Sequence, residues 1–171
     1  MLAINTQPPT TTSHPDREEF YATVGQALSD WQLVEGEIGG IFSVVIGNPG
    51  GALSNAAYYS IQSFRVRLLM VNATASVFLR NYPNLQTQWH KLYERTDDKN
   101  TIRNYLAHYM AVIIKTKKGT KMVIHPTIFK FDNLFNPTTR KYDIKQIKAW
   151  GTSFENLHTS LRQFNGLLPR R

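Results

Sequence analysis

The sequence predicts a mainly α-helical protein: a four-helix up-down bundle with a β-hairpin inserted before the last helix. Four segments place apolar residues at alternating three- and four-residue steps, which is the period of a helix with one buried face. Clusters of glycine, asparagine and proline separate the first segments. A later stretch has β-branched runs on both sides of a glycine, the pattern of a hairpin. Short connections between the first three helices favour antiparallel neighbours, and hence an up-down bundle.

The first helix is expected to begin near Asp16, because Asp16 and Glu19 have the spacing of a capping box. The apolar rhythm continues through Gly39 and Gly40, so one helix is expected there rather than two. A second helix is expected over about 53–80. The inward positions are Trp31, Val34, Ile38, Ile41, Phe42 and Val45 in the first helix, and Ile61, Phe64, Leu68, Val71, Ala75 and Phe78 in the second.

The third helix is expected to begin near Leu85 and to place Trp89 in the core. Its middle, residues 95–100, is wholly polar. The sequence therefore leaves two alternatives open: one long helix with an exposed waist, or two helices that meet at 97–100. The apolar rhythm returns at Ile102 and predicts that the helix continues beyond this point.

The hairpin is expected over about 110–131, with its turn at the Lys-Lys-Gly-Thr segment 117–120. Residues 127–131 are expected to add a short third strand. The last helix is expected to begin at Asp143, with Gln146 at capping-box spacing.

Composition predicts one domain and restricts its chemistry. The chain has 171 residues and no cysteine, which excludes disulfides, thiolate metal sites and a cysteine nucleophile. Residues 1–15 are rich in threonine and proline and predict a flexible N-terminal tail, and residues 16–171 predict a single helical domain. The sequence begins without the basic and apolar regions of a signal peptide, and its densest apolar run is too short to span a bilayer. We therefore expect a cytoplasmic protein with no membrane partner.

Charge points toward a polyanionic partner. Twenty Lys and Arg against twelve Asp and Glu give a net charge of +8. Residues 1–37 hold six acids and one base, a net −5, and the remainder carries +13. Such a balance fits nucleic acid or an anionic membrane surface, although a solvated basic face needs no ligand. The excess is expected beside any site that handles RNA.

Metal and phosphate motifs are missing from the sequence. No two of the five histidines have H-x3-H spacing, and His90 with Glu94 provides at most two ligands on a helix. The glycines at 47–51 follow a helix and lack the Lys-Ser/Thr ending of a phosphate-binding loop. No metal and no cofactor are therefore expected.

The segment with the most specific chemistry is Arg103-Asn-Tyr-Leu-Ala-His108. It resembles the R-x4–6-H motif of the HEPN superfamily, in which a polar residue, often Asn, commonly follows the Arg. Chance gives about 0.9 matches to the bare pattern in a chain of this composition, but only about 0.06 when Asn104 is required as well. Many members also carry a Trp and a Glu on the first helix, as Trp31 and Glu35 do here.

The resemblance implies a homodimeric, metal-independent endoribonuclease with a composite site. Arg103, Asn104 and His108 would be catalytic, and Glu35 would support them. The ribose 2′-OH would attack the adjacent phosphate and leave a 2′,3′-cyclic phosphate. Such proteins often act as toxins or in defence, which implies an antitoxin or regulatory protein as a possible partner. Further RNA-binding candidates are Tyr109, Lys99, Lys117 and Lys118.

Helix geometry limits what one chain can do with this motif. Asn104 and His108 are four residues apart and share a face, whereas Arg103 lies about 140° around the axis from His108. Either the helix starts within the motif, or a second copy of the chain completes the site.

Each motif residue also has a structural interpretation. Arg103 could pair with Asp97, Asp98 or Glu35; Asn104 could cap a helix; and His108 could be a hydrogen-bonded bundle histidine. Arg65 and Arg67 are two apart and cannot both face the core, so one of them could meet Glu35. A non-catalytic HEPN-like module that binds RNA or protein, or a plain helical scaffold, therefore remain alternatives.

Overall fold

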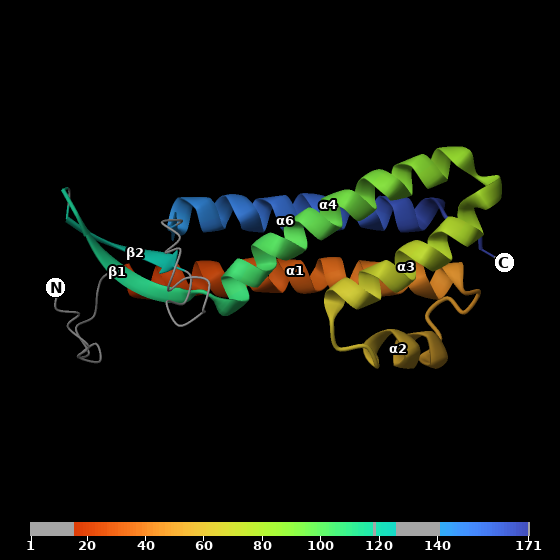
Figure 1. Ribbon diagram of the computed structural model, residues 1–171, viewed down its shortest axis with the longest axis horizontal. Coiled ribbons are helices and arrows are strands. Elements are labelled where there is room, and N and C mark those ends of the chain that lie inside the picture. The colour runs from red at the N-terminus through yellow and green to blue at the C-terminus, as the bar shows by residue number, and fades with distance from the viewer. Residues whose placement is uncertain (1–15, 118, 126–140, 171) are drawn as a thin grey trace, which may run out of the picture.

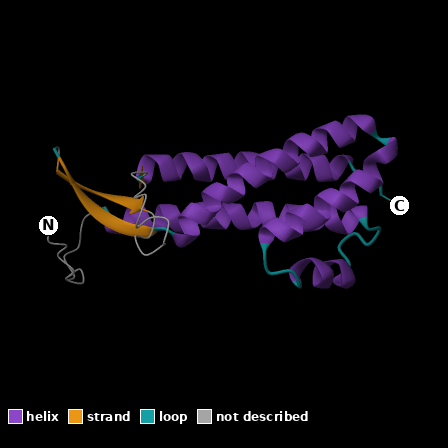
Figure 2. Cartoon of the chain, viewed as in Figure 1, coloured by secondary structure: helices purple, strands orange, loops and turns teal. Residues whose placement is uncertain are grey.

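Long helices lie lengthwise beside one another, and a small antiparallel sheet extends from one end of them (Figures 1 and 2). This computed structural model describes residues 16–117, 119–125 and 141–170. The elements are α1 (Arg17–Val45), α2 (Ala52–Tyr59), α3 (Phe64–Phe78), the short 3-10 helix η1 (Leu79–Asn81), α4 (Pro83–His108), β1 (Met110–Thr116), β2 (Gly119–His125), β3 (Tyr142–Asp143) and α6 (Ile144–Leu167). The expected fold class, mainly helical with a β-hairpin before the last helix, is confirmed.

Consecutive helices alternate in direction. The short α2 returns antiparallel along α1, where the Ser43 hydroxyl donates to the Ser54 hydroxyl at 2.8 Å. Because α2 takes this return path, α3 runs parallel to α1 (Figure 1). Helix α4 then runs back, and the indole of Trp89 on α4 donates to the Asn72 amide oxygen on α3 at 2.9 Å. Helix α6 lies beside α1 and parallel to it (Figure 1).

The expectation of a single helix over 53–80 is wrong, because α2 ends at Tyr59 and α3 begins only at Phe64. Tyr58 is fully buried, and its ring lies against the α1 backbone at Gly39. Phe64 is also buried, and its ring lies 5.0 Å from the ring of Trp31, which belongs to α1. In one straight helix these two side chains, six residues apart, would point about 120° away from each other. Burying both against α1 therefore requires the break.

Helix α4 is continuous, which decides between the two alternatives for the polar segment at 97–100. Thr96 and Asn100, one turn apart, are buried rather than exposed. The Thr96 hydroxyl donates to the Leu92 carbonyl at 2.7 Å, so its burial leaves no unsatisfied donor. The helix also passes unbroken through Arg103 and ends at His108.

The two expected helix caps differ. At the start of α6 the Asp143 carboxylate accepts a hydrogen bond from the Gln146 amide at 3.2 Å, as predicted. Helix α1 does begin after Asp16, but the side chain of Asp16 makes no capping hydrogen bond, so the expected capping box is not formed. The spacing of Asp16 and Glu19 correctly predicts where the helix starts, but the capping hydrogen bond that it predicts is not formed.

The sheet has the strand order β1-β2-β3, with all pairs antiparallel. Val112 lies opposite Val123, and the hairpin turns at Gly119, whose φ of 122° suits a residue without a side chain. The third strand of the sheet is β3. The expected strand at 127–131 lies outside the described residues, as does the predicted tail at 1–15.

Aromatic side chains form the centre of the core. Trp31 is completely buried, and its ring makes edge contacts with Phe64 of α3 and Phe154 of α6 at centroid distances of 5.0 and 5.2 Å. Helix α1 is therefore in contact with α3 and α6 at one level of the bundle, and Glu35 lies one turn further along it. None of the helices in the described ranges has an apolar segment long enough to cross a bilayer.

Candidate functional site

A buried carboxylate on α1 joins three helices. Glu35 is only 5% exposed and receives the Trp31 indole N–H at 2.6 Å. The Arg67 guanidinium from α3 lies 2.7 Å from its other oxygen, Oε2. Arg103 from α4 reaches Oε1 at 3.4 Å. Glu35 thus connects Trp31 on its own helix with Arg67 of α3 and with Arg103, the first residue of the Arg-Asn-x3-His motif on α4.

Arg67 is the arginine of α3 that faces the core. Its guanidinium lies over the ring of Tyr58, 4.9 Å from the ring centroid, and is nearly as buried as the carboxylate that it pairs with. The Tyr58 hydroxyl donates to the Glu35 backbone carbonyl at 3.1 Å. Burial raises the pKa of Tyr58 well above its ordinary value, although Arg67 opposes this, so the phenol keeps its proton. Arg65 is exposed, so the pairing expected for one of the two arginines belongs to Arg67.

Arg103 is held less tightly and stays partly in solvent. Its side chain is 26% exposed, and the 3.4 Å contact with Glu35 is long for an ion pair. A second nitrogen, Nη1, donates to the Asn104 side-chain oxygen at 3.2 Å. Arg103 and Asn104 therefore form a pair of neighbouring polar groups at the surface, anchored from below by Glu35.

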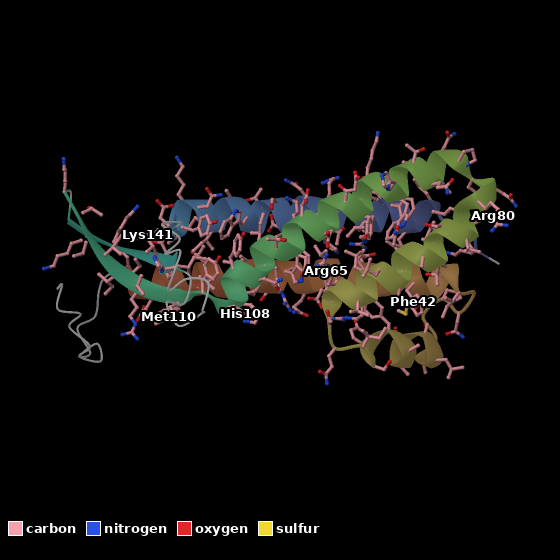
Figure 3. All side chains as sticks on the ribbon, viewed as in Figure 1. Phe42, Arg65, Arg80, His108, Met110 and Lys141 are labelled. Atoms are coloured by element: carbon pink, nitrogen blue, oxygen red, sulfur yellow. The ribbon has the colours of Figure 1, made fainter. Side chains whose placement is uncertain are left out.

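His108 is the last residue of α4, and its side chain is exposed where the chain passes into β1. Figure 3 shows it beside Met110, at the sheet end of the bundle and far from Arg80 at the other end. Since α4 continues through the whole motif, the helix does not start within it. Arg103 and His108 of one chain therefore point about 140° apart, while Asn104 shares the face of His108.

The structural interpretations of the motif have mixed outcomes. Of the three acids considered for Arg103, Glu35 is the partner within salt-bridge distance. Asn104 lies four residues before the end of α4 and is not a helix N-cap. His108 is exposed, which differs from a histidine inside the bundle.

The other RNA-binding candidates differ in how close they lie to Arg103 and His108. Lys99 is half-buried one turn before Arg103 on α4. Burial and the neighbouring Arg95 lower the pKa of Lys99, and Asp98 opposes them. Lys117 lies in the turn of the hairpin, about 23 Å along the strand from Met110 at 3.3 Å per residue, so one chain does not bring it to His108. Lys118 lies outside the described residues.

Tyr109 belongs to an aromatic cluster at the base of the sheet. Its ring stacks on Tyr105 at 4.8 Å between centroids, and Tyr142 lies 5.7 Å from Tyr105. Tyr142 in turn meets Trp150 of α6 edge-on at 4.7 Å. The half-buried Tyr109 thus helps to join the end of α4 to the start of α6. Its remaining exposed edge lies one residue from His108.

Two basic residues escaped the sequence reasoning. Lys91 and Arg95 lie on the exposed side of α4, and with Lys99 and Arg103 they follow one another at four-residue intervals. This spacing is present in the sequence, but of the four residues only Lys99 and Arg103 are candidates in the sequence analysis. No group of three or more His, Asp or Glu side chains that could hold a metal occurs in the part of the chain that the structure describes.

Comparisons of the chain with protein-family models, with curated proteins and with solved structures found no match. The chemical possibilities of the site therefore rest on its own residues. The site offers a fixed guanidinium, a neighbouring amide and an exposed imidazole. These groups can bind an anion and can transfer protons near neutral pH.

Proposed function

We propose that this protein is a metal-independent endoribonuclease of the HEPN type, in which Arg103, Asn104 and His108 act on RNA. The observation that carries the proposal is the anchoring of Arg103. Buried Glu35 holds one edge of the guanidinium, and Asn104 accepts from another nitrogen, while about a quarter of the side chain stays exposed. A guanidinium fixed in this way at a surface is prepared for a phosphate, because its planar fork can bind two oxygens and it stays charged.

The reaction divides between these groups. His108 takes the proton from the ribose 2′-OH, or gives one to the departing 5′-oxygen, since an imidazole can do either near neutral pH. The 2′-oxygen attacks the adjacent phosphorus and forms a 2′,3′-cyclic phosphate as the 5′-oxygen leaves. Arg103 stabilises the negative charge of the phosphorane, and Asn104 orients the phosphate or the imidazole. DNA lacks the 2′-OH and is not cut.

A homodimer completes the site in this proposal. Because Arg103 and His108 of one chain diverge, a two-fold axis near the end of α4 is needed to bring His108 of one chain toward Arg103 of the other. Met110 on β1 is 45% exposed and supplies apolar surface next to His108 for a second copy. An RNA substrate fits a cytoplasmic location. A role as a toxin or defence nuclease, with an antitoxin or regulatory partner, rests on the resemblance.

The ion pair between Arg103 and Glu35 favours a second candidate, a non-catalytic HEPN-like module that binds RNA or protein. In that case Arg103 holds α4 against α1, and the site binds without turnover. The two candidates differ in whether RNA is cut.

The decisive experiment incubates the purified chain with end-labelled RNA in EDTA. We expect products with 2′,3′-cyclic phosphate ends, and a loss of about 100- to 10,000-fold in His108→Ala. His90→Ala is the matched control, because His90 is an exposed histidine of the same helix, paired with Glu94 at 3.3 Å. Equal cleavage by His108→Ala and the unchanged chain contradicts the proposed chemistry. Binding of RNA without any cleavage supports the module.

Mixing two inactive variants tests the composite site. If Arg103 and His108 come from different chains, Arg103→Ala mixed with His108→Ala regains about a quarter of the original activity. Half of the randomly formed dimers are mixed, and each of these has one intact site of two. No recovery after subunit exchange, or a monomer in light scattering at assay concentration, overturns the composite site.

A further inference from the structure

The face of α4 that carries Lys91, Arg95 and Lys99 borders an open groove against α6. Two hollows lie along it, of about 280 and 300 Å³. Lys91 and Arg95 line the first hollow, and Arg95 and Lys99 line the second. None of the three bases forms a salt bridge with a residue in the described ranges. Asp98 is the one acid that lines either hollow.

The opposite wall of the groove carries uncharged hydrogen-bonding groups. These come from α6 at alternating three- and four-residue steps, so they share one face of that helix: Ser153, Asn156, Ser160 and Gln163. Hydroxyl and amide groups of this kind are common partners of phosphate and sugar oxygens in nucleic-acid complexes. The floor consists of buried apolar side chains such as Leu92 and Phe164, which offer no exposed ring for a base to stack on.

The other groove along α6, against α1, has the opposite character. Three acids line it, Glu19, Asp30 and Glu155, and its single base, Lys148, is paired with Glu19 at 2.6 Å. A polyanion would be repelled there and attracted on the α4 side. The two faces of one helix thus border an acidic and a basic groove, which makes the basic groove a specific feature rather than a general consequence of the +8 charge.

The basic row leads toward the proposed site. Lys91, Arg95, Lys99 and Arg103 are separated by four residues each, or about 6 Å along an uninterrupted helix, which gives a row of about 18 Å. Each step also turns by about 40° around the axis, so the row leaves the groove after Lys99 and ends at Arg103 on the side of α4 that meets Glu35. Burial and the charge of Arg95 lower the pKa of Lys99, with Asp98 opposing, which reflects how closely the bases are spaced. A bound phosphate chain would relieve this repulsion.

We propose that the groove between α4 and α6 binds the sugar-phosphate backbone of single-stranded RNA and guides it along α4 toward Arg103. The proposal rests on the proposed function for the nature of the nucleic acid and for the destination of the strand. The groove contacts phosphates and riboses rather than bases, so binding there is independent of sequence. The phosphates and riboses of a single flexible chain can enter the two hollows of about 280 and 300 Å³ one after the other.

The test measures binding of a fluorescent 2′-O-methyl RNA, which cannot be cleaved, by anisotropy at several salt concentrations. The variant Lys91→Gln/Arg95→Gln/Lys99→Gln is expected to bind at least about 10-fold more weakly. The slope of log K against log salt should fall by about 2, since single strands contribute about 0.7 per neutralised phosphate contact. The control Arg17→Gln/Arg80→Gln/Lys145→Gln removes the same charge from exposed positions outside the groove. Its slope should change by less than half as much.

Each outcome decides one of the two proposals. Equal losses in both triple variants overturn the groove and indicate a diffuse charge effect. If the chain cuts RNA but the groove variant leaves KM unchanged, the groove fails and the nuclease stands. If the groove variant loses binding but the unchanged chain cuts no RNA, the groove stands and the nuclease fails. Tight binding of an acidic peptide with none of RNA overturns the groove as an RNA track.

Discussion

The two arginines that contact Glu35 differ in what surrounds them. Arg67 pairs with Oε2 at 2.7 Å on the buried side of the carboxylate, which we call the closed side; its guanidinium lies over the Tyr58 ring, and its side chain is 9% exposed. Arg103 reaches Oε1 at 3.4 Å on the open side and is 26% exposed. One carboxylate therefore serves two purposes: it neutralises a core cation from α3, and it positions a surface cation on α4. The difference shows that a shared ion-pair partner does not imply a shared role.

The largest expected effect separates the two arginines by stability. Arg67→Ala leaves buried Glu35 with one distant cation, and we expect the free energy of unfolding to fall by about 3–5 kcal/mol. Arg103→Ala removes a longer, partly solvated contact and should cost about 1 kcal/mol or less. Urea unfolding at pH 7 measures both. Arg65→Ala is the control on the same helix turn and should stay within about 0.5 kcal/mol, because Arg65 is exposed. Equal losses for Arg67→Ala and Arg103→Ala would mean that Arg103 is structural, and would remove the distinction between the sides.

The next prediction concerns how tightly the closed side is packed. A Cβ at Gly39 would lie 3.1 Å from the ring of Tyr58, which cannot easily move, because its hydroxyl is bonded to the Glu35 carbonyl and Arg67 covers its face. Gly39→Ala should therefore destabilise by about 1–3 kcal/mol through overpacking, more than the roughly 0.5–1 kcal/mol that alanine gains in a helix.

The control for this prediction lies one turn earlier on α1. Gly36 is exposed, and a Cβ there would meet nothing within 4 Å. Gly36→Ala should thus stabilise the protein by about 0.5–1 kcal/mol in the same urea experiment. Opposite signs for the two substitutions support close docking of α2 on α1. If Gly39→Ala also stabilises, the closed side is looser than the contacts indicate.

Local sequence patterns predicted most of the helices and strands. The predictions failed where tertiary contacts, rather than local sequence, determine the structure. The periodicity of α1, the hairpin and the start of α6 depend on neighbours in sequence, so they could be read directly. The break between α2 and α3 could not, because it follows from burying Tyr58 and Phe64 on one partner helix. Each half of the segment 53–80 has a helical pattern, and only α1 reveals that the two halves need different orientations.

Some residues of the candidate site could also be predicted from the sequence, but not all of their contacts. The motif singled out Arg103, Asn104 and His108 but left open whether the helix starts within it, and the charge pattern left Arg65 and Arg67 as alternatives for Glu35. Sequence spacing could not choose between them, because the choice depends on which face α3 turns to α1. Lys117 shows the opposite limit: it is near His108 in sequence, but an extended strand carries it away from the bundle.

The smallest expected effect compares the N-terminal caps of α6 and α1. The Asp143 carboxylate accepts from the Gln146 amide at 3.2 Å and lies 3.3 Å from Lys121 Nζ, whereas the side chain of Asp16 makes no capping hydrogen bond. Asp143→Ala should cost about 1 kcal/mol, and Asp16→Ala should lack this contribution. Urea unfolding at pH 7 compares the two variants.

The contribution of Asp143 to stability depends on pH, and the direction of its pKa shift gives the sign of that dependence. Burial by itself would raise the pKa of the Asp143 carboxyl, but the Gln146 amide and the Lys121 ammonium outweigh it and hold the pKa below its ordinary value. A lowered pKa in the folded state means that the carboxylate stabilises the protein at neutral pH, and that this stabilisation is lost as pH falls through that pKa. The difference between Asp143→Ala and the unchanged chain should stay constant from pH 7 to 5 and shrink below about pH 4. A difference that persists unchanged to pH 3 would show that the ionised cap is not what holds the start of α6 beside the proposed site.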